Sequence, residues 1–147
     1  MATFARHVDV EWTGNLMEGS GTATAGTGAF SVPVTFPSRI APTSDTKTTP
    51  EELLAGAHAV CYAMVLTNTI VKQGGKAQSV RVTATVTGDK SDAGLKVVSS
   101  HLKAVVTGLE GLDKAGLSDL ATGAEKGCPI SNAIRGSVTI TVEAQAV

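Results

Sequence analysis

The two cysteines, Cys61 and Cys128, are the residues of this chain with the clearest potential for chemistry. A thiolate is a nucleophile, and it can be oxidised reversibly to a sulfenic acid or to a disulfide. Cys61 stands in the run Ala-Val-Cys-Tyr-Ala-Met, and Cys128 stands in Lys-Gly-Cys-Pro-Ile-Ser. The pair could serve a two-cysteine redox cycle, or it could be two inert thiols.

The spacing of the cysteines does not decide between these alternatives. Cys128 follows Cys61 by 67 positions, which is neither a Cys-x-x-Cys redox motif nor a zinc-ligand pattern. The histidines, His7, His58 and His101, are scattered, so a metal site has little support. His58 precedes Cys61 by three residues, but no oxyanion or pocket signal of a Cys-His protease accompanies it. We expect no metal and no cofactor.

The local sequence gives the two thiols different environments. Cys61 lies in the middle of an expected helix, where a free cysteine usually behaves as a small core hydrophobe. Cys128 is expected at the N-cap of a short helix with Pro129 at the first helical position. Unpaired backbone N–H groups and the helix dipole lower the pKa of a thiol there, although a plain capping role stays open. Local chemistry alone therefore favours Cys128 as the activated thiol.

A long helix must position Cys61. Thr49 is a good N-cap, Pro50 fits the first helical position, and Glu52 completes a capping box, so the helix begins there. It is expected to run to about Lys72 and to stop at Gly74 and Gly75. Residues 53–71 carry no formal charge over about the thickness of a bilayer, but only one such segment exists and no aromatic belt flanks it. We therefore predict a helix that is buried all round in the core of a soluble assembly, without a membrane.

The remaining segments predict strands and two further helices. Alternating polar and apolar residues predict strands at 6–12 and 30–36. Pro33 indicates that the second of these strands lies at a sheet edge. A further strand of small residues is expected within 14–28. A loop follows at 37–49. The later elements are a strand over 80–87, a turn over 89–94, a strand over 95–107, a helix over 113–126, a short helix from 128 to 136 and a strand over 137–146. This order predicts a single α+β domain over residues 1–147, with antiparallel sheet packed on the central helix.

Composition excludes several classes of function. The formal net charge is −1 and aromatic residues make up 3%, which gives neither an electrostatic footprint nor a stacking platform for nucleic acid. Apolar residues make up 42% and charged residues 17%, which suggests that part of the surface is covered by another copy of the chain. Residues 1–9 carry charges and no apolar h-region, so we expect no secretory signal and a cytoplasmic location.

Two segments resemble a known family. The run Thr-Thr-Pro-Glu-Glu-Leu-Leu-Ala-Gly-Ala-His-Ala-Val-Cys-Tyr-Ala-Met at 48–64 resembles the central-helix signature of the OsmC/Ohr superfamily, the osmotically inducible and organic-hydroperoxide-resistance proteins. Residues 126–131 look like the second-cysteine motif of the same superfamily. The resemblance extends to Glu-Trp-Thr-Gly at 11–14 and Asp-Ala-Gly at 92–94, and so covers essentially the whole chain. Because an arginine candidate, Arg39, stands in Phe-Pro-Ser-Arg at 36–39, the chain looks more like the OsmC branch.

The resemblance implies a thiol-dependent peroxidase that reduces organic hydroperoxides and, more weakly, hydrogen peroxide. In the family scheme Cys61 is the peroxidatic residue, and Cys128 resolves its sulfenic acid by forming a disulfide. A dithiol reductant, either a lipoylated protein or a small dithiol, then restores both thiols. The family fold is an intertwined homodimer that buries the long helices centrally and carries its active sites at the subunit interface.

The resemblance also implies an arginine and a glutamate. Because Cys61 lies in mid-helix, we expect no help from a helix terminus, so its thiolate needs a neighbouring cation. Arg39 is the candidate, and a solvated loop arginine is its plain alternative; weaker substitutes are Arg6, Arg81 and Arg135. Glu51 matches the family's catalytic glutamate, yet ten residues of helix separate it from Cys61 by about 15 Å. We therefore expect Glu51 to serve the arginine at a distance, or to act in the partner's site.

A second class of function stays open beside the peroxidase. The same fold could be a non-catalytic stress protein that binds a small ligand or a lipid, with both cysteines as packing residues. In either case we expect an apolar pocket, with plausible lining residues Phe36, Leu54, Tyr62 and Met64. Loss of activity on substitution of Cys61 would separate the two functions.

Overall fold

The computed structural model describes residues 2–43 and 45–147, so Met1 and Ser44, which belong to the predicted N-terminal segment and loop, lie outside the described residues. Internal contacts divide the chain into two compact units, one up to Pro50 and one from Glu51 to Val147. The prediction of a single domain over residues 1–147 stays a prediction.

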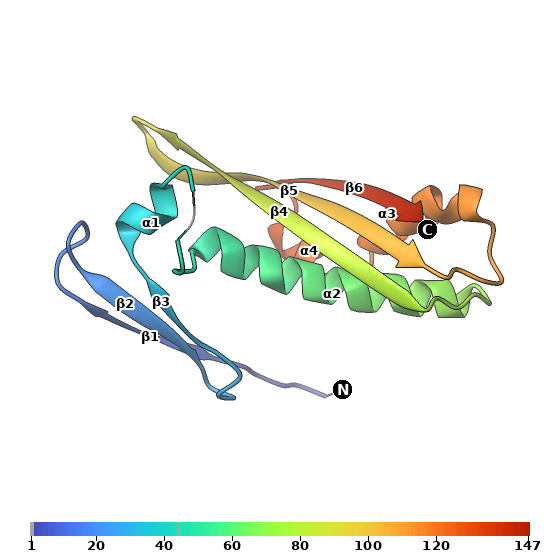
Figure 1. Cartoon of the computed structure of the whole chain (residues 1–147), viewed down its shortest axis with the longest axis horizontal. Coiled ribbons are helices and arrows are strands. Elements are labelled where there is room, and N and C mark those ends of the chain that lie inside the picture. Colours follow the sequence, from blue (N-terminus) through green and yellow to red (C-terminus); the bar gives the residue numbers. More distant parts are fainter. Residues whose placement is uncertain (1, 44) are drawn as a thin grey trace. The chain divides into compact units, whose positions relative to one another are not determined.

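The first unit contains an antiparallel sheet of three strands in the order β1-β2-β3 (Figure 1). Its strands are β1 (Val8–Thr13), β2 (Ser20–Ala25) and β3 (Ser31–Val34), as the alternating pattern predicts. In β2 the small residues Gly21, Ala23 and Ala25 are buried and their neighbours are exposed. Pro33 lies in β3 at the sheet edge, where a residue without an N–H group is tolerated.

A short helix, α1 (Phe36–Ile40), follows β3. The prediction of a loop from residue 37 to residue 49 is therefore wrong over its first part. Thr35 is the N-cap, and its hydroxyl accepts a hydrogen bond from the N–H of Ser38. Pro37 lies in the first turn, where backbone N–H groups have no partner within the helix, so its missing N–H group costs no hydrogen bond. A threonine two residues before a proline was the available signal for this helix.

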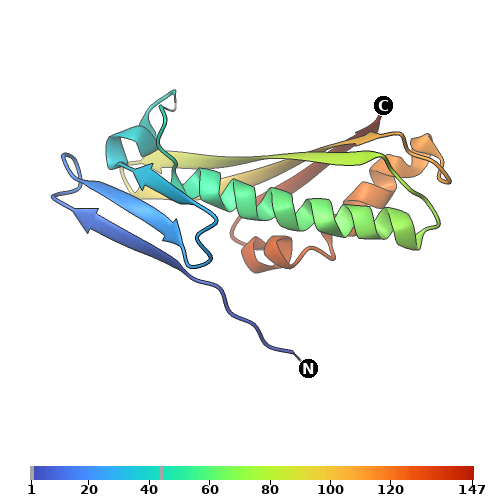
Figure 2. The ribbon, with the colours of Figure 1, turned by 60° about the horizontal axis from the view of Figure 1, so that its bottom comes forward.

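The second unit is built on α2 (Pro50–Lys72), which lies along a sheet of three strands (Figure 1). The helix has the predicted bounds. The chain leaves it through Gly74, whose φ of +85° is a left-handed conformation that glycine adopts without strain. The sheet order is β4-β5-β6, with β4 (Ser79–Ser91), β5 (Gly94–Thr107) and β6 (Thr139–Ala146). Figures 1 and 2 both show α2 running the length of the long β4–β5 hairpin.

The hairpin turn is tighter than the sequence predicts. Strand pairing continues through Asp89 and Lys90 to the pair Ser91 and Gly94, so the turn contains two central residues rather than the predicted 89–94. The φ of Gly94 is +120°, which side chains disfavour, and this glycine lets the chain reverse there. Polar residues at 89–91 are thus part of an exposed strand end.

The pairing of β6 also differs from the prediction. β4 and β5 are antiparallel as predicted, but β6 pairs with β5 in parallel. Parallel neighbours need a crossover, and the chain between them supplies η1 (Lys114–Gly116), α3 (Leu117–Glu125) and α4 (Pro129–Ile134). The predicted helices at 113–126 and from residue 128 are therefore present. The first begins as a 3-10 turn, and the second ends at Ile134 rather than at Gly136.

The core of the second unit lies between α2, the sheet and α3. Buried apolar residues of the three elements pack together: Tyr62, Leu66, Ile70, Leu102, Ala104, Val106, Leu117 and Ala121. Burial of such side chains contributes about 1.5–3 kcal/mol each relative to full exposure. This cluster fixes one face of α2 against the sheet.

The opposite face of α2 is exposed in the single chain, so its predicted burial all round within an assembly stays a prediction. Leu53, Val60, Met64 and Val71 are exposed by 38, 57, 68 and 59%. Among the described residues, α2 is also the one helix whose length and composition would allow it to cross a membrane. Its core-facing side chains nevertheless pack against the sheet and include the hydrogen-bonded His58 and Tyr62.

Candidate active site

The second unit brings the two cysteines together. Cys61 lies in α2 and is half-buried, and Cys128 is the fully buried N-cap of α4. Both are free thiols, and Cys61 packs against the buried cluster that contains Cys128. The sulfur of Cys128 lies near enough to raise the pKa of Cys61. Figure 2 shows α4 beside the middle of α2. The fold thus brings two residues that are 67 positions apart close together.

The start of α4 also affects Cys61. The backbone N–H of Ile130 lies near enough to the sulfur of Cys61 to lower its pKa. In the described part of the chain, Cys128 makes no capping hydrogen bond through its own side chain. The start of a helix other than α2 therefore lies near Cys61, which the sequence did not predict.

Burial decides the protonation of Cys61. Removal from water raises the pKa of the Cys61 thiol, since the charged thiolate is the form that burial penalises. The neighbouring sulfur of Cys128 raises it further, whereas the N–H of Ile130 opposes both effects. In the single chain the balance favours the protonated thiol. Nucleophilic attack by Cys61 thus requires additional stabilisation of the thiolate.

Arg39 and Glu51 belong to different units of the chain. Arg39 is half-buried in the last turn of α1, in the first unit. Glu51 lies in the first turn of α2, and its carboxylate is 3.7 Å from the position that a Cβ atom at Gly88 would occupy. Glu51 therefore lies over β4 near the hairpin bulge between Thr87 and Gly88. Their catalytic roles stay predictions.

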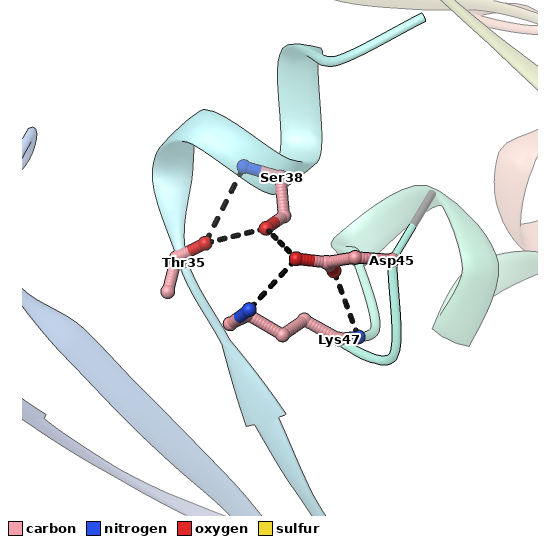
Figure 3. Close-up of polar contacts among 4 residues, drawn as sticks. All are labelled: Thr35, Ser38, Asp45 and Lys47. Atoms are coloured by element: carbon pink, nitrogen blue, oxygen red, sulfur yellow. Dashed lines mark hydrogen bonds and ion pairs between the residues drawn. The ribbon is translucent and has the colours of Figure 1, made fainter. Parts of the chain in front are cut away.

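A polar network holds the segment around Arg39 (Figure 3). The carboxylate of Asp45 accepts hydrogen bonds from the N–H of Lys47 at 3.0 Å, from its ammonium group at 2.7 Å and from the hydroxyl of Ser38 at 3.2 Å. The hydroxyl of Thr35 donates in turn to that of Ser38 at 2.7 Å. Lys47 holds the pKa of Asp45 below its ordinary value. The start of α1 is thereby tied to the segment that follows the helix.

The weaker arginine candidates have contacts of their own. Arg135 pairs with Glu125, with 2.7 Å between Nη2 and Oε1, and this links the end of α4 to the end of α3. Arg6 donates to the carbonyl of Ala5 and lies 5.5 Å from the ring centroid of Phe4. Arg81 is exposed on β4. Arg135 is thus engaged by a buried carboxylate.

His58 lies on the same helix face as Cys61, and its contacts were not predicted from the sequence. It is fully buried, and its Nδ1 and Nε2 atoms each lie 2.7 Å from a serine hydroxyl, those of Ser100 and Ser131. Burial lowers the pKa of His58, and the charge of Glu125 opposes that effect. The available signal was position, because His58 and Cys61 are three residues apart and so lie on one helix face.

Tyr62 belongs to the core rather than to a pocket, which corrects its expected role. Its side chain is fully buried, and its hydroxyl donates to the carbonyl of Ala121 at 2.8 Å. Burial raises the pKa of Tyr62, so the phenol stays protonated and keeps donating. Tyr62 fixes α3 to α2 one residue beyond Cys61. Phe36 and Leu54 are half-buried.

An open cleft of about 910 Å³ lies between the second half of α2 and α3. Met64 lines it, as expected of a pocket residue. The remaining lining residues are mostly small or apolar and include Val65, Asn68, Thr69, Leu120, Ala124 and Gly127. Val65 follows Cys61 by four residues and Gly127 directly precedes Cys128, so the cleft begins one helical turn beyond Cys61. Within the described ranges, no three His, Cys, Asp or Glu side chains gather as metal ligands.

Comparison with known families decides the family of the chain. The family described as OsmC-like protein matches residues 43–143, a stretch that includes both cysteines. The chain belongs to the OsmC-like protein family. The match begins before α2 and ends within β6, so it covers all of the second unit's helices.

Two curated relatives illustrate the family. Peroxiredoxin OsmC of Escherichia coli K12 is 30% identical over 139 residues, which cover 94% of this chain and 95% of that protein. Organic hydroperoxide resistance protein OhrB of Bacillus subtilis 168 is 29% identical over 104 residues, 67% of this chain and 70% of that protein. The resemblance to the OsmC/Ohr superfamily is thus confirmed over nearly the whole chain.

Solved structures share the fold. An organic hydroperoxide resistance protein from Elizabethkingia anophelis superposes with a TM-score of 0.76 at 24% identity, covering 100% of both chains. OhrB of Bacillus subtilis gives a TM-score of 0.71 at 23% identity, covering 95% of this chain and 98% of that chain. The α+β fold of two sheets and a long helix is therefore that of OsmC/Ohr proteins.

Proposed function

We propose that this chain is a thiol-dependent peroxidase that reduces organic hydroperoxides and, more weakly, hydrogen peroxide. The names of its relatives, a peroxiredoxin and an organic hydroperoxide resistance protein, support a peroxide-related stress function. The observation that carries the proposal is the proximity of the free thiols of Cys61 and Cys128 in the core of the second unit. Proximity of two free thiols is what a reversible disulfide requires.

In the proposed cycle the thiolate of Cys61 attacks the distal oxygen of the hydroperoxide. The O–O bond breaks, Cys61 becomes a sulfenic acid, and the leaving alkoxide takes up a proton and departs as the alcohol. The sulfur of Cys128 then attacks the sulfenic sulfur, a disulfide forms, and water leaves. A dithiol, either a lipoylated protein or a small dithiol, returns two electrons and two protons and is itself oxidised to its disulfide.

Arg39 and Glu51 complete the proposed site. A guanidinium group stays charged and would favour the Cys61 thiolate, which burial disfavours in the single chain. Glu51 would orient that guanidinium group as its ion-pair partner. Because Glu51 is ten residues from Cys61 along α2, it serves the arginine at a distance from the thiol or in the partner's site.

The proposal includes an intertwined homodimer. Leu53, Val60, Met64 and Val71 form an apolar stripe on the exposed face of α2, and a second copy of the chain would cover it. The apolar residues of β1, Val8, Val10 and Trp12, are likewise exposed by 48, 62 and 39%. A cycle that needs reduced thiols suits a reducing compartment, so we propose a cytoplasmic location.

Steady-state kinetics test the catalytic proposal. The purified chain should consume cumene hydroperoxide faster than hydrogen peroxide, and dihydrolipoamide should support turnover better than glutathione. Cys61→Ser should lower the rate by roughly a thousandfold or more, because it removes the nucleophile. Arg39→Lys, which keeps the charge but loses the planar fork, should lower it less than Arg39→Ala.

Intact mass gives the decisive observation. After one equivalent of hydroperoxide the chain should become two hydrogen atoms lighter, as a disulfide requires. An unchanged mass without peroxide consumption would reject the peroxidase. It would favour a non-catalytic stress protein that binds a small ligand or lipid in the cleft between α2 and α3, for which both cysteines would be replaceable.

Sedimentation tests the homodimer. The wild type should sediment as twice the chain mass, and Met64→Lys should produce monomer because it introduces a charge into the apolar stripe of α2. Thr85→Lys, on the exposed face of β4, is the control and should leave the dimer intact. A monomeric wild type would contradict the assembly without touching the redox chemistry.

A further inference from the structure

His58 is a buried titratable residue that the proposed peroxidase cycle does not use. Its ring lies at the meeting point of three elements, since it belongs to α2 and contacts Ser100 of β5 and Ser131 of α4. All three side chains are fully buried. A buried polar group that loses its partner costs about 1–3 kcal/mol, so these two bonds resist separation.

The bond to Ser131 lies next to the cysteine contact. In α4, Cys128 is the N-cap and Ser131 is the third helical residue, so both belong to the first turn. On α2, His58 and Cys61 are three residues apart and lie on one face. The first turn of α4 is therefore attached to α2 at two adjacent points. One is the thiol pair, and the other is the imidazole–hydroxyl bond.

The two serines differ in what they are attached to. Ser100 lies in β5, the central strand of its sheet, and pairs with Val86 on one side and Ile140 on the other. Ser131 lies in a helix of six residues, which is too short to be stable without tertiary contacts. Ser100 is thus the fixed end of the bridge, and Ser131 is the end that needs support.

A neutral imidazole suits this bridge. One ring nitrogen donates and the other accepts, and a serine hydroxyl can do either, so both bonds form at once without a charge. The orientation that Ser100 imposes on the ring then determines the position of Ser131. No buried side-chain nitrogen or oxygen among the described residues lacks a hydrogen-bond partner.

We propose that His58 is a positioning residue for the cysteine pair. Anchored by Ser100, its ring holds Ser131 and with it the first turn of α4. That turn keeps the thiol of Cys128, and the backbone N–H of Ile130, on the sulfur of Cys61. The two sulfur atoms must approach to about 2.05 Å with a defined torsion angle, so a displaced α4 slows the disulfide step. In its catalytic consequence the inference rests on the proposed peroxidase.

A matched pair of variants tests the proposal. Ser131→Ala and Ser100→Ala each remove one hydroxyl, each from a fully buried serine 2.7 Å from His58. If the two hydrogen bonds of His58 only stabilise the fold, both substitutions should slow disulfide formation equally. The positioning role predicts that Ser131→Ala alone frees the start of α4, whereas Ser100→Ala leaves the imidazole bonded to that helix.

The readout is the rate of disulfide formation with diamide, which takes up the two electrons and two protons that the thiols lose. We expect Ser131→Ala to slow this step about tenfold, because α4 loses its bond to the ring, and Ser100→Ala to slow it only about threefold, because the ring loses its anchor but keeps its bond to α4. After hydroperoxide, Ser131→Ala should also accumulate a sulfenic acid at Cys61 that dimedone traps. Equal slowing in both variants, or no slowing in Ser131→Ala, would overturn the proposal.

The experiment separates this inference from the proposed function. Diamide forms the disulfide whether or not the chain is a peroxidase. A wild-type chain that forms the disulfide with diamide but does not react with hydroperoxide would therefore contradict the proposed peroxidase and leave the proposed role of His58 standing. If the alanine variants do not fold, NMR of the wild type replaces them. The imidazole resonances of His58 should shift between the dithiol and disulfide forms, while those of His101, bonded to Thr141 on the sheet, should stay. Unshifted His58 resonances would overturn the proposal.

Discussion

The two short helices, α1 and α4, begin in similar ways but direct their first free N–H groups differently. Each has a proline in its first turn and a non-helical N-cap residue. In α1 the cap is Thr35, whose hydroxyl accepts the N–H of Ser38, so the helix satisfies its own donor. In α4 the cap is Cys128, which makes no such bond within the described residues, and the N–H of Ile130 lies near Cys61 and lowers its pKa. A weak cap thus leaves a donor available to another helix.

The largest expected effect comes from changing the cap of α4. Cys128→Ser and Cys128→Ala should both abolish the intramolecular disulfide, so hydroperoxide should leave a trappable sulfenic acid at Cys61. They should differ in the pKa of Cys61, measured as the pH dependence of its alkylation. The alanine variant should lower that pKa, since it removes a neighbouring sulfur that raises it.

The pKa of Cys61 should be higher in Cys128→Ser than in Cys128→Ala. A serine cap competes for the free N–H groups of α4, and the hydrogen bond to Cys61 weakens as a result. Identical values in the two variants would contradict the link between the weak cap and the thiol.

Acid should affect the α4 region at a higher pH than the α1 region. The pKa of buried His58 lies below its ordinary value of 6.5, so the unfolded chain takes up a proton that the folded chain refuses. The free energy of unfolding should therefore fall as the pH drops below about 6.5. Glu125 is the charge that opposes this effect at His58, and it is itself paired with Arg135.

Asp45 changes stability in the same direction as His58, but at a lower pH. Lys47 holds its pKa below the ordinary 3.8, so its contribution is present above that pH and is lost only as the pH falls through the lower folded value. Urea unfolding between pH 7.5 and 3 checks both expectations, with His58→Gln flattening the upper part of the curve. His101→Gln is the control, and an equal flattening there would refute the assignment to His58.

The smallest expected effect comes from removing the cap of α1. Thr35→Ala should destabilise that helix by about 1 kcal/mol, because the N–H of Ser38 loses its acceptor. Hydrogen exchange of the Ser38 amide should speed up, while the rate of diamide-driven disulfide formation should stay at the wild-type value. A slower disulfide in Thr35→Ala would show that the two helix starts are not independent.

The sequence allowed most of the elements to be predicted, because their signals are local. Pro50, the charge-free run and Gly74 define α2 by capping and composition, and alternation defines the strands. The parallel direction of β6 had no such signal, since it depends on how the whole crossover folds back. Helix α1 was missed because its five residues resemble a loop that contains proline.

The site was predicted only in part, because its contacts join residues that are far apart in the sequence. The two cysteines were identified from motifs, but their contact joins α2 to α4 across a long separation in sequence. The donation from Ile130 was missed because the backbone of one helix serves a side chain of another. His58 looked like a scattered histidine, since both of its partners, Ser100 and Ser131, are distant in sequence.

The parallel pairing of β6 with β5 bears on the order in which the chain folds during synthesis. The β4–β5 hairpin is local and can form early, whereas β6 must return across the sheet through α3 and α4, a slow, non-local step. Cys128 lies inside that returning segment. We therefore expect a nascent chain that lacks β6 to hold its two thiols apart. The reactive pair would then form with the last strand, which limits premature oxidation of unfinished chains.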